Sequence, residues 1–373
     1  MTRSFCIGRV LGIDIEIDYT WFIVFLLVAV ALSTDWSARY LPHLSFAARW
    51  LIGIVTALLF FASVLLHELA HSVVARQSGL GISGITLFLF GGVSKMSDEP
   101  RSPGVELRVA LAGPLTSLAL AALFLGLSFL LKLAPAGAAF SRVFGWLGLM
   151  NGMLAVFNML PGFPLDGGRV LRAGIWGATR NLMDATRIAA AFGQGLGFLM
   201  IVGGVAMALT GGISGLWLAV IGWFLLQAAQ SSYQQLLLRQ ALAGVPVSSV
   251  MTREVQWVPA DLPLDQVVHD HVMVYNHPAF PVMEGTRLLG LLSLGDIRHV
   301  PRERWPYVQA REVVPALTPE QSILPQADVW EALLKMTGGN AGRLLVTRGG
   351  AVEGILSRTD IMRLMRRRME LGV

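Results

Sequence analysis

The stretch from Trp50 to Ala75 reads WLIGIVTALLFFASVLLHELAHSVVA, and it decides how this chain folds. Only Glu68 in this run carries a charge; His67 directly precedes it and His71 follows three residues later. A hydrocarbon core about 30 Å thick is crossed by about 20 apolar residues in helical form. The run is therefore long enough to be a transmembrane helix, with ionisable side chains at membrane depth.

The composition of the whole chain also indicates a membrane protein. Hydrophobic residues make up 54% of the 373 residues and charged residues 14%, against roughly 25% charged in typical soluble domains. Long uncharged runs fill the first 240 residues, whereas the stretch from Arg253 to Arg368 has the composition of a soluble domain. The net charge of +5 needs no nucleic-acid partner, because positively charged loops face the cytoplasm in membrane proteins.

Neither a disulfide framework nor a removable signal peptide is expected. Cys6 is the only cysteine, which excludes an intrachain disulfide. Arg3 and Arg9 are followed by Glu16 and Asp18 rather than by an apolar run with a small-residue cleavage site.

Six transmembrane spans are predicted from the uncharged runs, and they place residues 1–240 in a multi-pass membrane domain. The predicted spans are 19–36, 50–75, 109–131, 143–165 and two within 188–238, which the segment 210–215 divides. Six spans leave both termini on one side of the membrane. The loops on that side carry ten lysines and arginines and those on the opposite side four, so we expect the N-terminus and the C-terminal domain to be cytoplasmic.

The stretch from Gly81 to Val93 does not read as a helix. Large apolar residues alternate with smaller ones, and Gly91-Gly92 closes the run, which predicts a short strand or hairpin at membrane depth. Such backbone is tolerated there only where it is shielded by protein or lines a wet cavity. We therefore expect a functional cavity nearby.

The five residues from His67 to His71 form the His-Glu-x-x-His pattern of zinc metalloproteases. Helical spacing of four puts both imidazoles on one face, within reach of a single ion. Glu68 would take a proton from water activated by the metal and deliver it to the leaving amine. The pattern also arises by chance on exposed helices of soluble proteins, but ionisable residues without a function are costly in a membrane span.

A catalytic zinc needs a third protein ligand and one open position. The candidate is Asp166, at the end of the fourth span in Asn158 to Arg169, which reads NMLPGFPLDGGR. Two prolines and three glycines break the helix there and can turn the carboxylate back into the bundle.

With these residues the chain closely resembles the site-2 protease family of intramembrane zinc metalloproteases (peptidase M50 type), in the six-span branch with appended CBS domains. The resemblance is carried by His67–His71, Phe90–Val93, Ala112–Pro114 and Asn158–Gly168. It implies a polytopic α-helical membrane domain with a short membrane-embedded β-element, followed by an α/β CBS pair. The implied activity is that of a zinc metalloendopeptidase that hydrolyses peptide bonds in or near transmembrane segments of membrane protein substrates, as in regulated intramembrane proteolysis.

The resemblance also assigns roles to single residues. His67, His71 and Asp166 would be the ligands of one catalytic Zn2+, and Glu68 the general base and acid. Asn158 would be a polar helper near the substrate carbonyl or oxyanion, or alternatively a helix–helix hydrogen bond. Family members often carry Asn three residues after the Gly-Pro pair, where this chain has Ser117, which puts a contribution from that site in doubt.

The predicted strand gains a role from the same resemblance, because a helical substrate must be unwound before its peptide bonds can be attacked. An exposed strand edge could capture the unwound segment by strand addition. The alternative is that the strand simply packs the bundle. The connections 131–143 and 209–216 are too short for an inserted periplasmic domain, so regulation is expected from the cytoplasmic side.

A repeat occupies the C-terminal part of the chain. GLLSLGDI at Gly290–Ile297 recurs as GILSRTDI at Gly354–Ile361, offset by 64 residues. The pattern is similar to a pair of CBS domains, predicted at 245–300 and 301–373. Such pairs often bind adenine nucleotides and can form homodimers, which by position would make Asp296 and Asp360 nucleotide contacts. The other interpretation, which can hold at the same time, is that both aspartates cap the following helices with Ser293 and Ser357.

Two other functional classes fit parts of the sequence. CBS pairs are also attached to channels and transporters, but no internal repeat is visible among the spans. A scaffold that has lost catalysis would have no need for all three ligands and Glu68. The histidines His269, His271, His277 and His299 are interpreted as ordinary surface or ligand-cleft residues rather than as a second metal site.

Overall fold

A computed structural model describes residues 4–96, 100–134, 137–275, 277, 279–338, 342–349 and 351–371. Contacts along the chain divide it into two compact units, Met1–Gln234 and Gln235–Val373. The first unit is a helical bundle with a small sheet, and the second holds two small sheets with helices.

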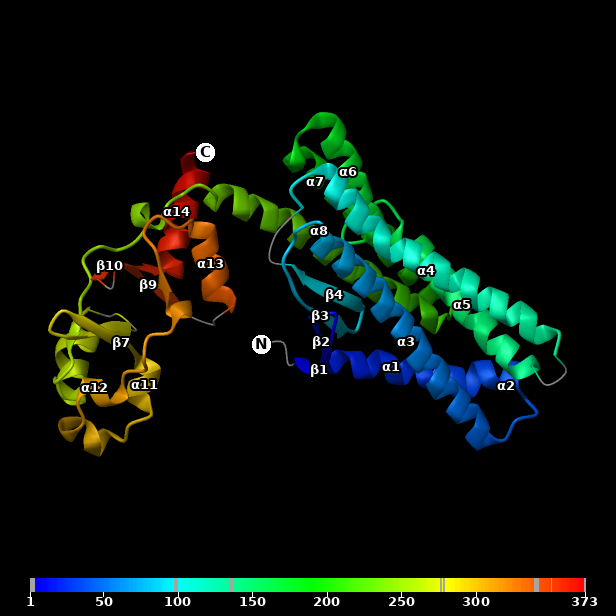
Figure 1. The fold of residues 1–373 in the computed structure, drawn as a ribbon, viewed down its shortest axis with the longest axis horizontal. Helices are drawn as coiled ribbons and strands as arrows, with labels where there is room; N and C mark the ends of the chain where they lie inside the picture. The colour runs from blue at the N-terminus through cyan, green and yellow to red at the C-terminus, as the bar shows by residue number, and fades with distance from the viewer. Residues whose placement is uncertain are drawn as a thin grey trace. The chain divides into compact units, whose positions relative to one another are not determined.

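Long helices make up most of the first unit, and α3, α4 and α5 lie side by side in it (Figure 1). Its helical segments are α1 (Tyr19–Ala31), a π-helical turn (Leu32–Trp36), α2 (Ser37–Tyr40), α3 (Phe46–Gln77), α4 (Pro103–Lys132), α5 (Ala138–Asn158), α6 (Asp166–Thr179), α7 (Leu182–Leu209) and most of α8 (Ile213–Leu242). Among the described residues, five helical stretches are long and apolar enough to cross a membrane: Tyr19–Tyr40, Phe46–Gln77, Pro103–Lys132, Ala138–Asn158 and Leu182–Leu209. They overlap the first five predicted spans and confirm a polytopic helical membrane protein.

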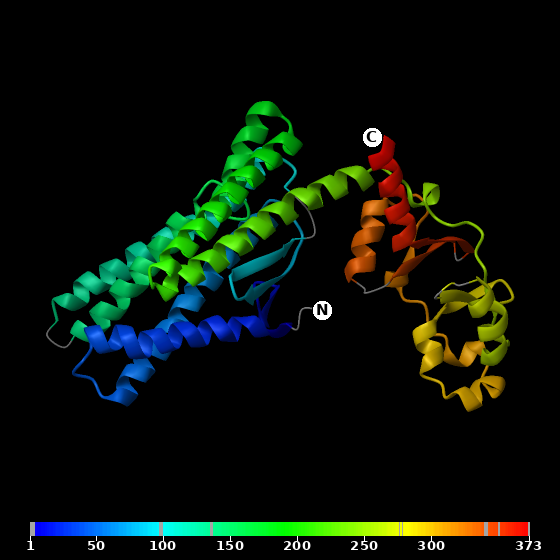
Figure 2. The same ribbon diagram turned by 180° about the vertical axis from the view of Figure 1, so that it is seen from behind.

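The sixth predicted span corresponds to α8, which begins at the predicted break. This helix is 30 residues long but carries five glutamines between positions 227 and 240, and the count of six spans stays a prediction. Seen from behind, α7 and α8 run alongside each other (Figure 2). Their backbones approach closely at Gly197 and Gly222, where a Cβ on either residue would lie 2.7 Å from the carbonyl oxygen of the other.

The fourth helix is shorter at its C-terminal end than expected. The predicted span ran to Leu165, whereas α5 ends at Asn158. Pro161 has no backbone N–H to continue the helical hydrogen bonds, so residues 159–165 form a loop and a separate helix, α6, begins at Asp166.

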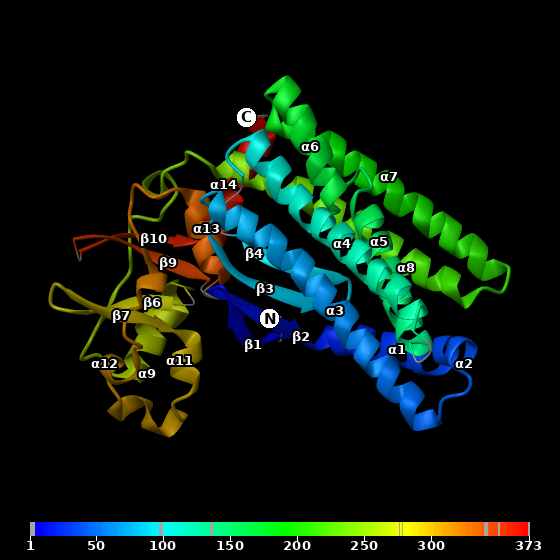
Figure 3. The same cartoon turned by 45° about the vertical axis from the view of Figure 1, so that its right-hand side comes forward.

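The predicted hairpin is present as β3 (Ile82–Phe88) and β4 (Gly91–Met96), which pair antiparallel beside α3 (Figure 3). Two further strands, β1 (Ser4–Val10) and β2 (Ile13–Asp18), complete a sheet of order β1-β2-β3-β4, with β2 and β3 parallel. The sequence analysis missed these two strands. The signal was available, because Ile13, Ile15 and Ile17 are buried and alternate with acidic residues.

The sheet packs on the helices through an apolar cluster. Ile13 and Ile85 are fully buried in it, against Trp21 of α1 and Phe61 of α3. The opposite face of the sheet is polar, and there Glu16 on β2 accepts hydrogen bonds from Lys95 Nζ at 2.7 Å and from Ser4 Oγ at 2.6 Å.

The second unit contains two three-stranded sheets of order β5-β6-β7 and β10-β9-β8. Its strands are β5 (Val258–Pro259), β6 (Ala279–Glu284), β7 (Arg287–Ser293), β8 (Ser322–Ile323), β9 (Arg343–Arg348) and β10 (Ala351–Ser357). Its helices are α9 (Leu264–Gln266), α10 (Met273–Tyr275), α11 (Leu294–Arg298), α12 (Ala310–Val313), α13 (Val329–Gly338) and α14 (Arg358–Leu371), with a π-helical turn at Val267–Val272 and 3-10 turns at Val247–Ser249, Arg302–Tyr307 and Pro319–Gln321. This confirms the predicted α/β character of the C-terminal region.

The two cores of this unit interleave along the chain. Val247 and Met251, from the start of the region, are buried in the core of the second sheet together with Val346. Val308 and Ala310, from the middle of the region, are buried in the core of the first sheet. Each half is therefore completed by a segment that lies outside its own repeat.

Glu16 provides a test of the polar face of the first sheet. The Lys95 ammonium, and after it the Ser4 hydroxyl, hold the pKa of Glu16 below its usual value of 4.5. Its ionised form therefore stabilises the fold above pH 4.5, and this contribution is lost as the pH falls through the lowered pKa. We expect Glu16→Gln to lower stability at pH 7 by about 1 kcal/mol or less, and the difference from wild type to vanish in acid.

Thermal unfolding of the two proteins from pH 7 to pH 3 measures this difference. The matched control is Asp35→Asn, because Asp35 is exposed and has no ion pair with another described residue. A difference that grows on acidification would contradict the assignment.

Candidate active site

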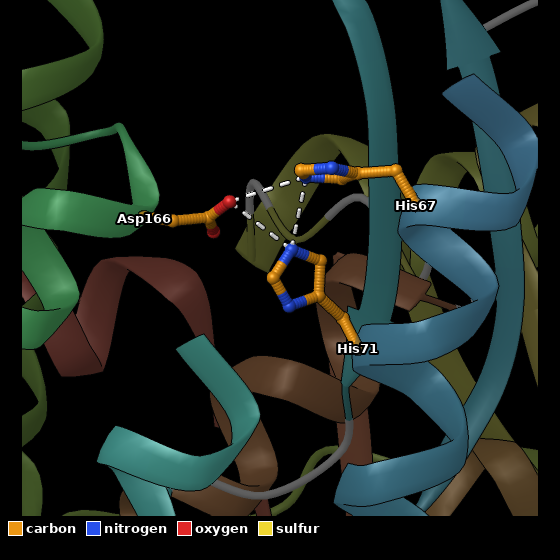
Figure 4. A group of neighbouring side chains, drawn as sticks. All are labelled: His67, His71 and Asp166. Carbon is orange, nitrogen blue, oxygen red and sulfur yellow. Dashed lines mark hydrogen bonds and ion pairs between the residues drawn. The ribbon is translucent and has the colours of Figure 1, made fainter. Parts of the chain in front are cut away.

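Three side chains converge inside the first unit (Figure 4). Asp166 Oδ2 lies 3.2 Å from His67 Nε2 and 3.1 Å from His71 Nε2, and the two nitrogens are 3.2 Å apart. All three residues are buried. Within the described part of the chain this is the one group of histidine, cysteine and acidic residues arranged to hold a metal ion, and the C-terminal histidines do not form a second.

The two imidazoles come from α3, and α4 orients them. His71 Nδ1 lies 2.7 Å from the carbonyl oxygen of Val109. A carbonyl only accepts, so Nδ1 carries the proton and Nε2 presents its lone pair to the site. His67 Nδ1 lies 2.9 Å from the hydroxyl of Ser117, which is fully buried on α4.

Ser117 thus has a place in the site that the sequence analysis left in doubt. It stands three residues after Gly113-Pro114, where the family resemblance led us to expect asparagine, and its hydroxyl meets the ring of His67. A hydroxyl accepts from or donates to Nδ1 as required, so serine can hold this imidazole in place.

Gly113 explains why α4 can approach the histidines at all. A Cβ at this position would lie 2.5 Å from His67 Nε2 and closer still to His71 Nε2. Any larger residue would fill the space toward which both nitrogens point. The Ala-Gly-Pro motif therefore keeps a cradle open on the side of the rings that faces Asp166.

Asp166 reaches the same point because the loop before it folds back onto α7. The backbone N–H of Phe163 donates to the carbonyl oxygen of Ala189 at 3.1 Å, and Asp166 is the first residue of α6. The carboxylate is turned into the bundle, as the proline and glycine content of the loop predicts.

Glu68 lies beside this group and is covered by the hairpin. A Cβ on Gly92 of β4 would lie 3.0 Å from Glu68 Cδ, so the strand rests directly on the glutamate side chain. Asn158 is half-buried at the end of α5, and its amide makes no hydrogen bond with another described residue. The structure does not join Asn158 to the histidines and Asp166.

The two aspartates singled out in the C-terminal region are both helix caps. Asp296 Oδ2 accepts hydrogen bonds from the backbone and hydroxyl of Ser293 at 2.8 and 2.6 Å. Asp360 Oδ2 does the same with Ser357, at 3.0 and 2.6 Å. The capping alternative is therefore realised at both positions.

Comparison with known proteins identifies the family. The profile of peptidase family M50 matches residues 55–136 and 126–202, and that of the CBS domain matches 247–303 and 310–367. A protein of Synechocystis named as a zinc metalloprotease, sll0528, is 34% identical over 98% of this chain and 96% of its own length. The chain belongs to peptidase family M50.

Two further similar proteins were found. Rip3 of Mycobacterium tuberculosis, also named as a zinc metalloprotease, is 34% identical over 98% of this chain and 93% of its own length. The site-2 protease structure from Methanocaldococcus jannaschii is 30% identical, covers 62% of this chain and 95% of its own, and superposes with a TM-score of 0.44. The predicted metalloprotease with membrane helices and CBS domains is confirmed, and the channel or transporter alternative falls away.

The cradle at Gly113 predicts an effect on metal binding. In Gly113→Ala the added methyl group occupies the space in front of the two Nε2 atoms, so zinc affinity should fall about tenfold or more. Elemental analysis of the purified full-length protein after dialysis against a weak chelator measures the retained zinc. Gly126→Ala is the matched control, because Gly126 lies on the same helix with nothing within 4 Å of its Cβ position. Equal zinc retention in both variants would contradict the cradle.

Proposed function

We propose that this M50 protease is an intramembrane zinc endopeptidase in which His67, His71 and Asp166 hold one catalytic Zn2+. The observation that carries the proposal is the convergence of their three ligand atoms within 4.8 Å of one another in a bundle of membrane helices. Two imidazoles and a carboxylate are a ligand set typical of catalytic zinc, and they leave one position open. When bound, zinc supplies a Lewis acid that polarises the scissile carbonyl and acidifies water.

The remaining steps fall to residues of this chain. Glu68 follows His67 directly on α3 and lies beneath Gly92, where it can take a proton from the attacking water and give it to the leaving amine. Val109 and Ser117 keep the two imidazoles oriented throughout. Asn158 would donate its amide to the developing oxyanion, and the lack of a described partner for that amide supports this role.

The substrate would be a transmembrane segment of another membrane protein, as in regulated intramembrane proteolysis. β4 is an edge strand of its sheet, so its outer hydrogen-bonding groups are not used by a neighbouring strand. An unwound substrate segment could add to this edge. Since Gly92 on β4 contacts Glu68, the added segment would pass the general base.

The distribution of charge supports one orientation of this protein in the cell membrane. Ten lysines and arginines lie in the N-terminal arm and in the connections between the predicted spans on the side of the N-terminus, and four lie on the opposite side. By the positive-inside rule the N-terminus and the CBS pair face the cytoplasm.

The zinc assignment is tested by metal content together with cleavage. His67→Ala and Asp166→Ala should each lose the single zinc per chain of the wild type. Glu68→Gln should keep the zinc and its melting temperature but cleave a membrane-embedded reporter peptide at least about 100-fold more slowly, because only the proton transfer is removed. Elemental analysis and a detergent-based cleavage assay measure both effects.

Each variant can overturn a different part of the proposal. Zinc retained in both ligand variants would place the metal elsewhere. Cleavage at the wild-type rate by Glu68→Gln would remove that residue from its role as the general base.

We also propose that the CBS pair binds an adenine nucleotide, contacted by Asp296 and Asp360, and that it supports a homodimer. Each aspartate uses Oδ2 for its cap. Oδ1 of Asp296 has no partner among the described residues, which leaves it available to a ribose hydroxyl, and Oδ1 of Asp360 lies 3.6 Å from Arg363.

Nucleotide binding can be tested without disturbing the caps. Asp296→Asn and Asp360→Asn keep an oxygen for the serine but remove the charge, so ATP or AMP affinity should fall about tenfold through loss of a charged hydrogen bond. Calorimetry on the full-length protein measures it, with Glu353→Gln on β10 as control. No heat of binding with the wild type, or equal affinity in the aspartate variants, would contradict the assignment.

A further inference from the structure

A buried ion pair joins the helix behind the histidines to the helix that supplies the aspartate. Glu106 on α4 is fully buried, and its Oε1 accepts a hydrogen bond from Arg172 Nε on α6 at 2.6 Å and contacts the Nη2 of the same guanidinium. The Arg172 side chain is 12% exposed. Two full charges are therefore held out of water at one point between the helices.

On α4, Glu106 lies on the same face of the helix as the residues that contact the histidines. Glu106, Val109, Gly113 and Ser117 follow one another at spacings of three and four residues, which places them along one face of the helix. Val109 accepts from His71, Gly113 leaves room for both rings and Ser117 contacts His67. The position of this face decides where the two imidazoles point.

On α6, Arg172 holds the segment that presents Asp166. It follows Asp166 by six residues on the same helix, and its guanidinium lies 5.0 Å from the centre of the Phe163 ring. Phe163 is buried in the loop before Asp166 and is tied to α7 by its backbone N–H. One guanidinium thus contacts α4 and the loop that leads into the ligand.

We propose that Glu106 and Arg172 are a positioning pair for the metal site: their ion pair fixes α6 against α4, so that Asp166 Oδ2 meets the two Nε2 atoms. The inference rests on the proposed zinc site. A carboxylate and a guanidinium attract strongly and in a defined geometry when desolvated, so a shift of α6 would separate buried charges at high cost.

General stabilisation of helix packing does not explain the ion pair of Glu106 and Arg172. Oε2 of Glu106 is buried without a hydrogen-bond partner among the described residues, which is a cost that an apolar contact would avoid. A few other helix contacts in the bundle use uncharged groups, such as the reciprocal hydrogen bonds of Ser128 and Ser141 at 2.7 and 2.8 Å between α4 and α5. Between α4 and α6, by contrast, the contact is charged and directional.

The first measurement is zinc affinity by competition with a chelator, on the full-length protein in detergent. Glu106→Gln and Arg172→Gln should each weaken zinc binding about tenfold or more, as outer-shell changes do. The zinc affinity of Arg172→Lys should lie between those of these variants and the wild type, because lysine keeps the charge but lacks the planar guanidinium. The zinc affinity of the double variant should fall no further than that of the worse single variant, because neither member of the pair is left buried without the other.

Ser128→Ala is the control for general destabilisation of the bundle. It removes a buried interhelical contact on the same helix, away from the histidines. It should lower the melting temperature while leaving zinc affinity unchanged.

A metal-free readout separates this inference from the zinc proposal. An ideal Cβ at Gly177 on α6 would lie 3.7 Å from Pro103 Cβ at the start of α4, close to the separation of about 3.8 Å in a disulfide. In a Cys6→Ser background, Pro103→Cys with Gly177→Cys should cross-link under mild oxidation. Adding Glu106→Gln or Arg172→Gln should reduce the yield in metal-depleted protein.

The outcomes are distinct. Weaker zinc binding with reduced cross-linking supports the positioning pair. Wild-type zinc affinity in both single variants overturns it, whether or not cross-linking changes, and so does an equal loss of zinc in Ser128→Ala. If the wild type binds no zinc, the proposed function fails, and unchanged cross-linking would then also remove the pair from any role in placing α6.

Discussion

The cost of placing polar groups inside an apolar bundle governs the membrane unit of this protease. Each ionisable side chain of the His-Glu-x-x-His stretch lies on a helix whose other residues are almost all apolar, so every polar atom there needs a partner within the protein. His71 finds one in a backbone carbonyl of α4, His67 in a buried hydroxyl, and both share the carboxylate of Asp166. The arrangement of α3, α4 and α6 follows from meeting these requirements together.

The site divides its tasks among elements that are far apart in the sequence. α3 supplies the two histidines and Glu68, α4 orients the rings and keeps a cradle open, and α6 brings Asp166. The hairpin covers Glu68 through Gly92, which places an edge strand beside the group that would transfer the proton.

The C-terminal unit obeys a different constraint, because its sheets must bury apolar faces that neither repeat can cover by itself. Segments exchange between the repeats, so that Val247 and Met251 fill one core and Val308 and Ala310 the other. The aspartates of the repeated motif are used as caps of α11 and α14. Capping leaves one carboxylate oxygen of Asp296 without a partner among the described residues, so a structural role and a ligand-binding role are compatible at that position.

Sequence alone determined the features that depend on neighbouring residues: the lengths of the apolar runs, the spacing of His67 and His71, the helix break before Asp166 and the C-terminal repeat. These follow from local periodicity and from residue types that stop a helix. It did not reveal β1 and β2, although the alternation of Ile13, Ile15 and Ile17 was a signal for the second of them. The partner of Ser117, the clearance at Gly113 and the pairing of Glu106 with Arg172 were decided by the tertiary structure. Contacts between residues 50 to 99 positions apart depend on how helices are rotated and packed against one another, and the pattern of a single helix does not specify that rotation.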